Sequence, residues 1–362
     1  VETPKQKTFG DISFNAPLVL GSVLKKNPLI LAEEFKNLIV KNNNDFDKIE
    51  ITKPGFINFT FKKKTLLNFL GKIQNNFGFS NNKNSKKINI EFVSANPTGP
   101  LHIGHCRGAI YGDVLSNLLK FCGHNVSKEY YINDYGNQIT LFLKSIYFRA
   151  VEIVKKKKFP EDQGLYPGTY IIDITKEILK KINIDDYDNF EDAKITLGSI
   201  AIDLAMNLIK NDLDIMGIKH DIFTSESAIV RENILSKAIN KLKDKGAIYK
   251  GVLPKPKGEI EDWEPREQLL FKATNYGDDV DRALQKSDNT WTYFANDIAY
   301  HYHKLNREYD HYINILGADH AGYIKRLFSA VSALNNKKKF EIKISQIVKL
   351  YKGGKPYRMS KR

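Results

Sequence analysis

Two imidazoles near the start of an expected helix could bind a phosphate group. The stretch 96–105 reads Asn-Pro-Thr-Gly-Pro-Leu-His-Ile-Gly-His and ends with His102 and His105. An alternating apolar run precedes it, and apolar residues with helical spacing follow at 109–122, so Pro and Gly shape a strand-to-helix turn. A helix start carries unpaired N–H groups and partial positive charge, which favour phosphate. Gly104 leaves room for a flat base against the backbone.

A second group of residues with chemical potential is the cationic loop 353–362, Gly-Gly-Lys-Pro-Tyr-Arg-Met-Ser-Lys-Arg. Arg358 and Lys361 could supply positive charge from the opposite side of a triphosphate, where negative charge develops during displacement at phosphorus. Each motif alone has a plain alternative. The histidines could be an ordinary buried or surface pair, and the loop could be a solvated tail. Both motifs together in one α/β chain are far more specific.

Composition limits the classes of protein that are possible. The 362 residues, 42% of them hydrophobic, suffice for two or three domains with real cores. A formal charge of +14 suggests a polyanionic partner such as nucleic acid, although a solvated basic surface would explain it equally well. Two cysteines without a CxxC pattern argue against a structural zinc site or a disulfide scaffold. We expect a reduced, cytoplasmic protein without membrane contact, and a fragment of something longer, because both ends look cut.

The pattern of apolar residues predicts an α/β fold built from two domains. Residues 1–80 form a small α/β domain, 81–87 a polar linker, and 88–362 a larger domain. A strand–helix–strand pattern from 88 to about 145 predicts a parallel sheet. Helical stripes over about 146–265 predict a largely helical insertion that splits this Rossmann-like sheet into two halves.

The signature stretches resemble those of a known family. His-Ile-Gly-His at 102–105 and Met-Ser-Lys at 359–361 look like the two signatures of class I aminoacyl-tRNA synthetases. The surroundings resemble the bacterial arginyl-tRNA synthetases in particular, at 94–108, 129–134, 277–279, 292–301 and 317–323. The opening segment is similar to that family's N-terminal domain, which is implied to touch the tRNA outer corner. The likeness covers nearly all of the chain.

The resemblance implies a ligase and its partners. Such an enzyme activates L-arginine with ATP to arginyl-adenylate, and then transfers arginine to the 3′ end of its tRNA. ATP enters as a substrate complex with Mg²⁺, with no tightly bound cofactor and no metal held by protein ligands. We expect the partners to be tRNA for arginine, L-arginine and ATP, and the chain to be a monomer. The family also implies a role for bound tRNA in the activation step.

The resemblance also assigns residues to the ATP site. His102, His105 and Lys361 are the catalytic candidates, because they would stabilise the departing negative charge. Gly104, Met359 and Arg358 complete the expected ATP site. Arg358 stands where the common pattern has lysine, and a planar guanidinium is not equivalent to an ammonium group.

The arginine site is expected at Asn96, Tyr293 and Asp297. Tyr293 and Asp297 lie four residues apart in a helical pattern, so they face one way. Asp297 would pair with the substrate guanidinium, and Tyr293 would add a hydroxyl and a flat face. Without the family motif, a surface carboxylate is the better interpretation of Asp297. Ser94, together with Asp319 and His320 after an expected strand, are further candidates; the latter two could bind nucleotide or amino acid.

Other interpretations remain open beside this one. The family carries a C-terminal helical anticodon-binding domain, which this sequence does not include. Another nucleotidyl transferase with a His-x-Gly-His motif, such as a cofactor adenylyltransferase, would leave the first domain and the insertion unexplained. A non-catalytic tRNA-binding protein would not need His102, His105 and Lys361. The spacing of His301, His303 and His311 fits no metal-ligand pattern, and we expect ordinary core or surface histidines there.

Overall fold

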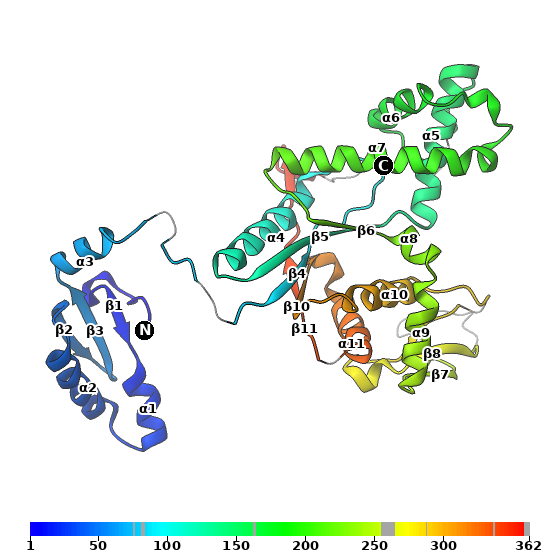
Figure 1. The fold of residues 1–362 in the computed structure, drawn as a ribbon. Helices are drawn as coiled ribbons and strands as arrows, with labels where there is room; N and C mark the ends of the chain where they lie inside the picture. Colours follow the sequence, from blue (N-terminus) through cyan, green and yellow to red (C-terminus); the bar gives the residue numbers. More distant parts are fainter. Residues whose placement is uncertain are drawn as a thin grey trace. The chain divides into compact units, whose positions relative to one another are not determined.

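The structure is a computed structural model that describes residues 1–74, 77–80, 84–161, 164–254, 265–286, 288–335 and 337–357. Arg358, Met359 and Lys361 lie outside the described residues. The chain separates into two compact units, Val1–Phe79 and Ser80–Arg362 (Figure 1). The division falls one residue before the expected end of the first domain.

The first unit is an antiparallel sheet with helices packed on it. Strand β3 lies between β1 and β2. Its core includes Ala32, Ile57 and Phe59. Helix α2 starts where the side chain of Asn27 accepts a hydrogen bond from the N–H of Leu29 (2.9 Å), directly before a proline. The elements are η1 (Lys7–Phe9), β1 (Ile12–Phe14), α1 (Ala16–Leu24), α2 (Pro28–Asn42), β2 (Phe46–Thr52), β3 (Phe56–Phe61) and α3 (Lys63–Leu70).

The second unit is built on a five-stranded sheet in the order β11-β10-β4-β5-β6, and every pairing is parallel. The expected α/β fold with a parallel sheet is thereby confirmed. The chain leaves β4 toward β5 on one side and later returns to β10 on its other side, so the strand order reverses at β4. In such sheets ligands bind at the carboxyl ends of the strands beside this reversal. The strands are β4 (Lys87–Glu91), β5 (Asn125–Ile132), β6 (Ile222–Ser225), β10 (His311–Gly317) and β11 (Lys339–Ser345).

The helical segment between the half-sheets differs from the range expected at about 146–265. Helices α5 (Asn137–Lys155), α6 (Thr169–Leu179) and α7 (Phe190–Ile215) lie between β5 and β6, and the chain rejoins the sheet at Ile222. We call these three helices the helical layer. Strand β6 has four residues between two long helical stripes, which is too short for an alternating pattern to stand out.

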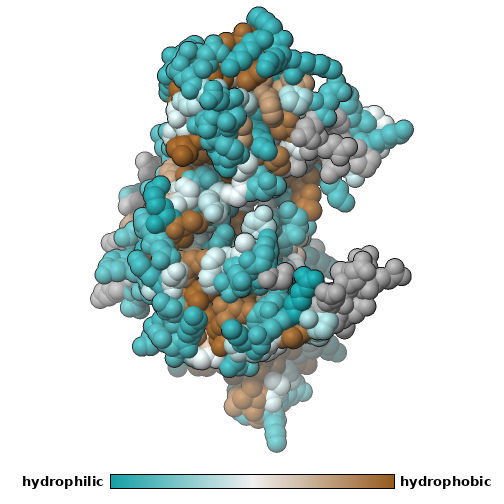
Figure 2. All heavy atoms as spheres, turned by 90° about the vertical axis from the view of Figure 1, so that its right-hand side faces the viewer, coloured by the Kyte–Doolittle hydropathy of each residue, from teal (hydrophilic) through white to brown (hydrophobic). Residues whose placement is uncertain are grey.

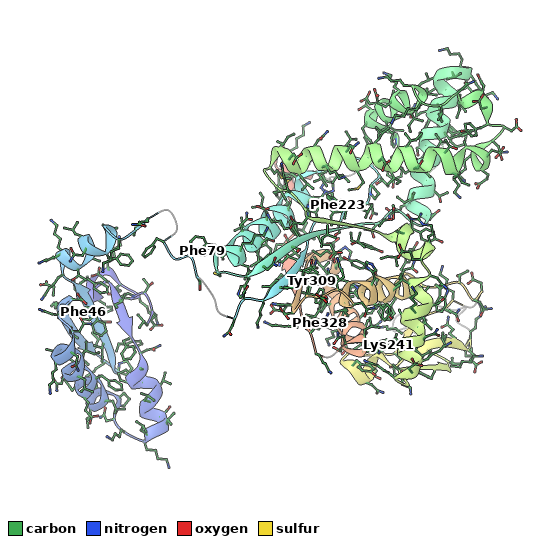
Figure 3. The ribbon with its side chains drawn as sticks, in the orientation of Figure 1. Phe46, Phe79, Phe223, Lys241, Tyr309 and Phe328 are labelled. Carbon is green, nitrogen blue, oxygen red and sulfur yellow. The ribbon has the colours of Figure 1, made fainter. Side chains whose placement is uncertain are left out.

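Helix α7 belongs to two cores. Ala193, Leu197 and Ala201 pack with α5 and α6. Further along, Met206, Ile209 and Leu213 pack with residues of the sheet. In the same half of the helix, the Nζ of Lys210 stands 4.6 Å from the ring centre of Phe223 on β6 (Figure 3). The helical layer and the sheet therefore share one continuous helix (Figure 1).

The remaining elements complete the second unit. Phe328 of α11 meets Phe340 of β11 edge-on with ring centres 5.3 Å apart, so α11 covers that strand (Figure 3). On the face shown in Figure 2, hydrophilic residues cover most of the surface and separate the apolar patches. Within the described residues, no helix is long and apolar enough to cross a bilayer. The elements are α4 (Ile103–Phe121), η2 (Ile184–Asp186), α8 (Glu226–Arg231), α9 (Ile234–Asp244), β7 (Ile248–Gly251), β8 (Gln268–Phe271), η3 (Ala273–Tyr276), β9 (Arg282–Ala283), α10 (Tyr293–Leu305), η4 (Ala318–Tyr323), α11 (Ile324–Leu334), β12 (Leu350–Lys352) and β13 (Lys355–Tyr357).

Candidate functional site

The turn between β4 and α4, residues 92–102, is held in an unusual backbone conformation. Val93 and Ser94 have positive φ angles of 70° and 44°, which residues other than glycine rarely adopt. Ser94 is fixed by its neighbours: its Oγ donates to Glu91 Oε1 (3.2 Å) and accepts from the N–H of Tyr131 (3.0 Å). Side-chain hydrogen bonds therefore stabilise the strained backbone where the chain leaves the sheet.

His102 and His105 form the start of α4. His102 is the N-cap, and its Nδ1 accepts from the N–H of Gly104 (3.1 Å). The Nδ1 of His105 accepts from the N–H of His102 (3.2 Å), and the two rings stack with centres 3.8 Å apart. A ring nitrogen that accepts a hydrogen bond carries no proton, so in both neutral rings the proton lies on Nε2. Each Nε2–H is therefore a donor of the kind that a phosphate oxygen accepts.

A pocket of about 630 Å³ opens at the carboxyl ends of β4 and β10, a size that suits a small ligand. It brings together most of the residues that the sequence assigned to nucleotide and amino-acid binding. Its walls include Ser94, Asn96, Thr98, His102, Gly104, His105, Gln138, Tyr166, Gly317, Asp319, His320, Ser345 and Ile347. Segments far apart in the chain thus meet at the edge expected for a ligand site.

Asp319 and His320 lie in η4, directly after β10. The carboxylate of Asp319 turns back over Gly317, where an added Cβ would stand 2.3 Å from Asp319 Oδ1. A side chain at 317 would therefore displace the exposed carboxylate of Asp319 from this position. His320 Nε2 is 3.7 Å from Asp319 Oδ2, and both side chains are exposed. Their position in the wall permits contact with either a nucleotide or an amino acid.

Tyr293 and Asp297 share one side of α10, but they are not among the lining residues of this pocket. Tyr293 is 73% exposed. Asp297 is partly buried and accepts a hydrogen bond from the hydroxyl of Tyr323. Burial, together with the nearby carboxylate of Glu91, raises the pKa of Asp297 to about 6, although the Tyr323 hydrogen bond opposes this shift. Asp297 therefore lies within electrostatic range of Glu91, which is bonded to Ser94 in the turn.

Glu226 and Asp134 are acidic neighbours of Asp297 that the sequence did not indicate. Glu226 is buried, and burial followed by Asp297 and Asp134 raises its pKa to about 7. Asp134 accepts hydrogen bonds from the N–H of Ser227 (2.8 Å) and the hydroxyl of Ser225 (2.7 Å). We call Asp134, Glu226 and Asp297 the acidic cluster. Both missed residues follow the carboxyl ends of strands, but β6 was hidden inside the expected helical range.

A buried ionic network lies below the turn. Lys304, which is fully buried, bonds Glu91 Oε2 (2.6 Å) and Asn314 Oδ1 (2.9 Å) and lies 3.7 Å from Glu129 Oε2. Burial would raise the pKa of Glu129, but Lys304 and Arg307 lower it to about 2. The network therefore fixes Glu91, the carboxylate that touches Ser94.

His301 has a structural role. Its Nδ1 lies 2.8 Å from the carbonyl oxygen of Asp297, and its Nε2 lies 3.2 Å from Nδ2 of Asn314. Burial lowers its pKa to about 4. Within the ranges that the structure describes, no group of three His, Cys, Asp or Glu residues could hold a metal ion.

The five-stranded parallel sheet and the histidine-capped helix at its carboxyl edge define a class I tRNA synthetase catalytic domain. The family model of tRNA synthetases class I (R), catalytic domain, matches residues 68–348, and the arginyl tRNA synthetase N-terminal domain matches residues 1–61. The chain belongs to the arginyl-tRNA synthetase family, and the resemblance seen in the sequence is confirmed.

Curated relatives and solved structures agree. The chain is 53% identical to an arginine–tRNA ligase of Pelagibacter ubique and 44% identical to that of Anaplasma phagocytophilum, with all of the chain covered in both cases. It spans 64% and 63% of their lengths. The arginyl-tRNA synthetase of Thermus thermophilus shares the fold, with a TM-score of 0.65 at 17% identity over 96% of this chain and 61% of that one.

Proposed function

We propose that this chain carries the catalytic part of an arginine–tRNA ligase. The carboxylate of L-arginine attacks the α-phosphorus of ATP, the bond to pyrophosphate breaks, and arginyl-adenylate forms. A ribose hydroxyl of the terminal adenosine of tRNA then takes the arginyl group, and AMP leaves. The observation that carries this proposal is the pocket at the reversal of the strand order, which has a histidine-capped helix start in its wall.

At the phosphate end of the site, His102 and His105 donate from Nε2 to phosphate oxygens, and Gly104 lets the base approach the backbone. ATP arrives as its Mg²⁺ complex, which is a substrate. We assign Lys361, Met359 and Arg358 to the same end from the family signature alone, with Lys361 stabilising the charge that develops on the leaving pyrophosphate.

At the arginine end, the acidic cluster supports a cation site. Burial, followed by neighbouring carboxylates, raises the pKa values of Asp297 and Glu226, which favours any cation that restores their ionised forms. A guanidinium can bond two carboxylates at once because its donors form a planar fork. Tyr293 would cover the guanidinium, and Asn96 would bind the amino-acid end. A neutral amino acid would leave buried carboxylates unpaired, so it is rejected.

We further propose tRNA for arginine as partner, a cytoplasmic location and a monomeric state. The net charge of +14 supports a polyanionic partner. Binding to tRNA should weaken steeply as salt rises, because counterions released from phosphates drive it.

The test is exchange of labelled pyrophosphate into ATP, with and without arginine and total tRNA. Exchange that requires arginine supports the ligase. RNA binding without exchange would favour a non-catalytic tRNA-binding protein. Exchange that requires a phosphorylated cofactor precursor as the acceptor of the adenylyl group, and neither arginine nor tRNA, would favour a cofactor adenylyltransferase.

Asp297→Asn sharpens the test because it removes one charge at constant size. We expect arginine to bind about 30-fold more weakly or worse, with ATP affinity unchanged, since a desolvated ion pair contributes at least ~2 kcal/mol. Calorimetric titration with each ligand measures this. Asp203→Asn on the exposed side of α7 is the matched control. Unchanged arginine affinity in the Asp297 variant would refute the assignment.

A further inference from the structure

An aromatic ring from the helical layer packs against the turn that forms one wall of the pocket. The ring of Tyr170 on α6 fits between two glycines: an added Cβ at Gly99 would lie 2.7 Å from Tyr170 Cε2, and one at Gly168 would lie 2.5 Å from Cε1. Gly99 also has φ = 146°, which other residues rarely adopt. The hydroxyl of Tyr170 donates to the carbonyl oxygen of Thr98 (3.0 Å). Shape and hydrogen bonding thus act on the same two residues of the turn.

The other two helices of the layer also reach the turn. Asp212 of α7 accepts a hydrogen bond from the N–H of Leu101 through Oδ2 (2.8 Å). Asn96 donates from Nδ2 to Gln138 Oε1 on α5 (2.6 Å). Each helix of the layer therefore contributes a contact to the segment between the sheet and His102. The sheet fixes the beginning of the turn through Ser94, and the helical layer fixes the rest.

We propose that Tyr170 is a positioning residue for the nucleotide pocket, which sets the turn 96–102 in the conformation that places Asn96 and His102 in the pocket wall. Tyr170 acts through the backbone of Thr98 and Gly99. This inference rests on the proposed function only in taking the pocket as the ATP site. Its consequence is that the helical layer and the pocket are mechanically coupled, so a change in the orientation of α6 alters the position of His102.

A purely structural role predicts something different. Tyr170 also packs against the core of the helical layer. If packing were its whole contribution, removal of the hydroxyl would leave the turn unaffected, because the phenyl ring keeps the same shape.

The decisive measurement is amide hydrogen exchange, followed by mass spectrometry of peptides covering 95–105, in Tyr170→Phe. We expect exchange in this peptide to become about fivefold faster, the effect of one lost hydrogen bond, with protection of β5 and α7 unchanged. Tyr187→Phe is the matched control, because Tyr187 packs on the same helical core. Unchanged exchange in the turn, or equal acceleration throughout the helical layer, would overturn the proposal.

A second variant applies the same test without depending on the hydroxyl. Alanine is strained at the φ angle of residue 99, and its Cβ would collide with the Tyr170 ring. Amide exchange of the turn in Gly99→Ala should therefore rise more than in Tyr170→Phe. If Gly99→Ala leaves the exchange of 95–105 at the wild-type rate, Tyr170 does not set the turn.

Enzyme kinetics separate this inference from the proposed function. Where the wild-type chain shows arginine-dependent exchange, Tyr170→Phe should lower kcat about fivefold while KM for ATP changes less than about twofold, because the histidines are displaced mainly for the transition state. A change in KM alone would contradict the positioning role. Absence of exchange in the wild-type chain would count against the ligase proposal, whereas the amide-exchange result would still decide the role of Tyr170.

Discussion

At the scale of single residues, the carboxyl groups of Asp297 and Glu226 have pKa values near neutrality, about 6 and about 7. In the unfolded chain both groups titrate near their ordinary values, 3.8 and 4.5. Between about pH 4.5 and 7 the folded state therefore holds more protons, so the free energy of unfolding falls as pH rises through this window. Because the two groups interact, they titrate as a pair. The proposed guanidinium ligand would offset this cost by restoring the ionised forms of both carboxylates.

The proposed arginine site predicts a pH-dependent affinity. A guanidinium bound at the acidic cluster would need ionised carboxylates, so we expect the Kd for arginine to be about tenfold higher at pH 6 than at pH 8 for one group of pKa about 7. Calorimetric titration across this range measures it. Glu226→Gln should flatten the profile. A wild-type Kd constant between pH 6 and 8 would show that these carboxylates do not receive the guanidinium.

Residue types and local spacing predicted where the two histidines lie in the fold, but they did not indicate the acidic cluster. The sequence placed His102 and His105 at a helix start, and the structure shows His102 as the N-cap of α4. Glu226 was missed because it meets Asn296 only after folding, across 70 residues of chain. No local sequence pattern indicates a contact between residues so far apart in the chain. The predicted roles of Tyr293 and Asp297 stay predictions.

At the scale of elements, α4 depends on a glycine that lets it approach the sheet. An added Cβ at Gly112 would lie 2.2 Å from the ring of Phe92, which is fully buried. One turn earlier, the nearest atom to an added Cβ at Gly108 is the Oγ of Ser345, at 3.9 Å. The same residue type therefore serves two different purposes in one helix.

This contrast gives a matched pair of substitutions. Gly112→Ala should lower the free energy of unfolding by about 1–3 kcal/mol, because the buried ring must shift. Gly108→Ala should raise it by about 0.5–1 kcal/mol, because alanine favours the helix and meets ordinary space. Urea unfolding followed by circular dichroism measures both. If Gly112→Ala proved as stable as Gly108→Ala, the close approach of α4 to Phe92 would be disproved.

Elements in which apolar residues recur with a clear helical or strand period were predictable from the sequence, and the short strand β6 was not. The parallel sheet followed from the strand–helix–strand pattern at 88–145. Strand β6 contributes four residues at the sheet edge, and its register is set by pairing with β5. That partnership is a property of the folded chain and has no signature within Ile222–Ser225 itself.

At the scale of the whole molecule, the buried network around Lys304 ties together elements from across the second unit. Through Glu91, Glu129 and Asn314 it joins α10 to β4, β5 and β10. Removing one charge from such a network leaves its partners buried without compensation. The first unit has a separate core, made of residues such as Ile57 and Phe59.

Lys304→Met should therefore destabilise one unit selectively. We expect the second unit to lose about 3–5 kcal/mol of its free energy of unfolding, while amide protection in β2 and β3 stays unchanged. Hydrogen exchange of both units in one sample measures this. Lys325→Met, which removes an exposed pairing with Asp279, should leave the free energy of unfolding almost unchanged and serves as control. Equal loss of protection in both units would contradict their independence.

The shared helix α7 limits how evolution or a protein engineer can exchange parts of this fold. A module bounded by loops can be cut out and replaced at its ends, but here the two cores meet within one continuous helix, where Ile202 packs on both. A helical layer moved to another protein would have to include the last turns of α7, with side chains that already fit the strands of the recipient sheet.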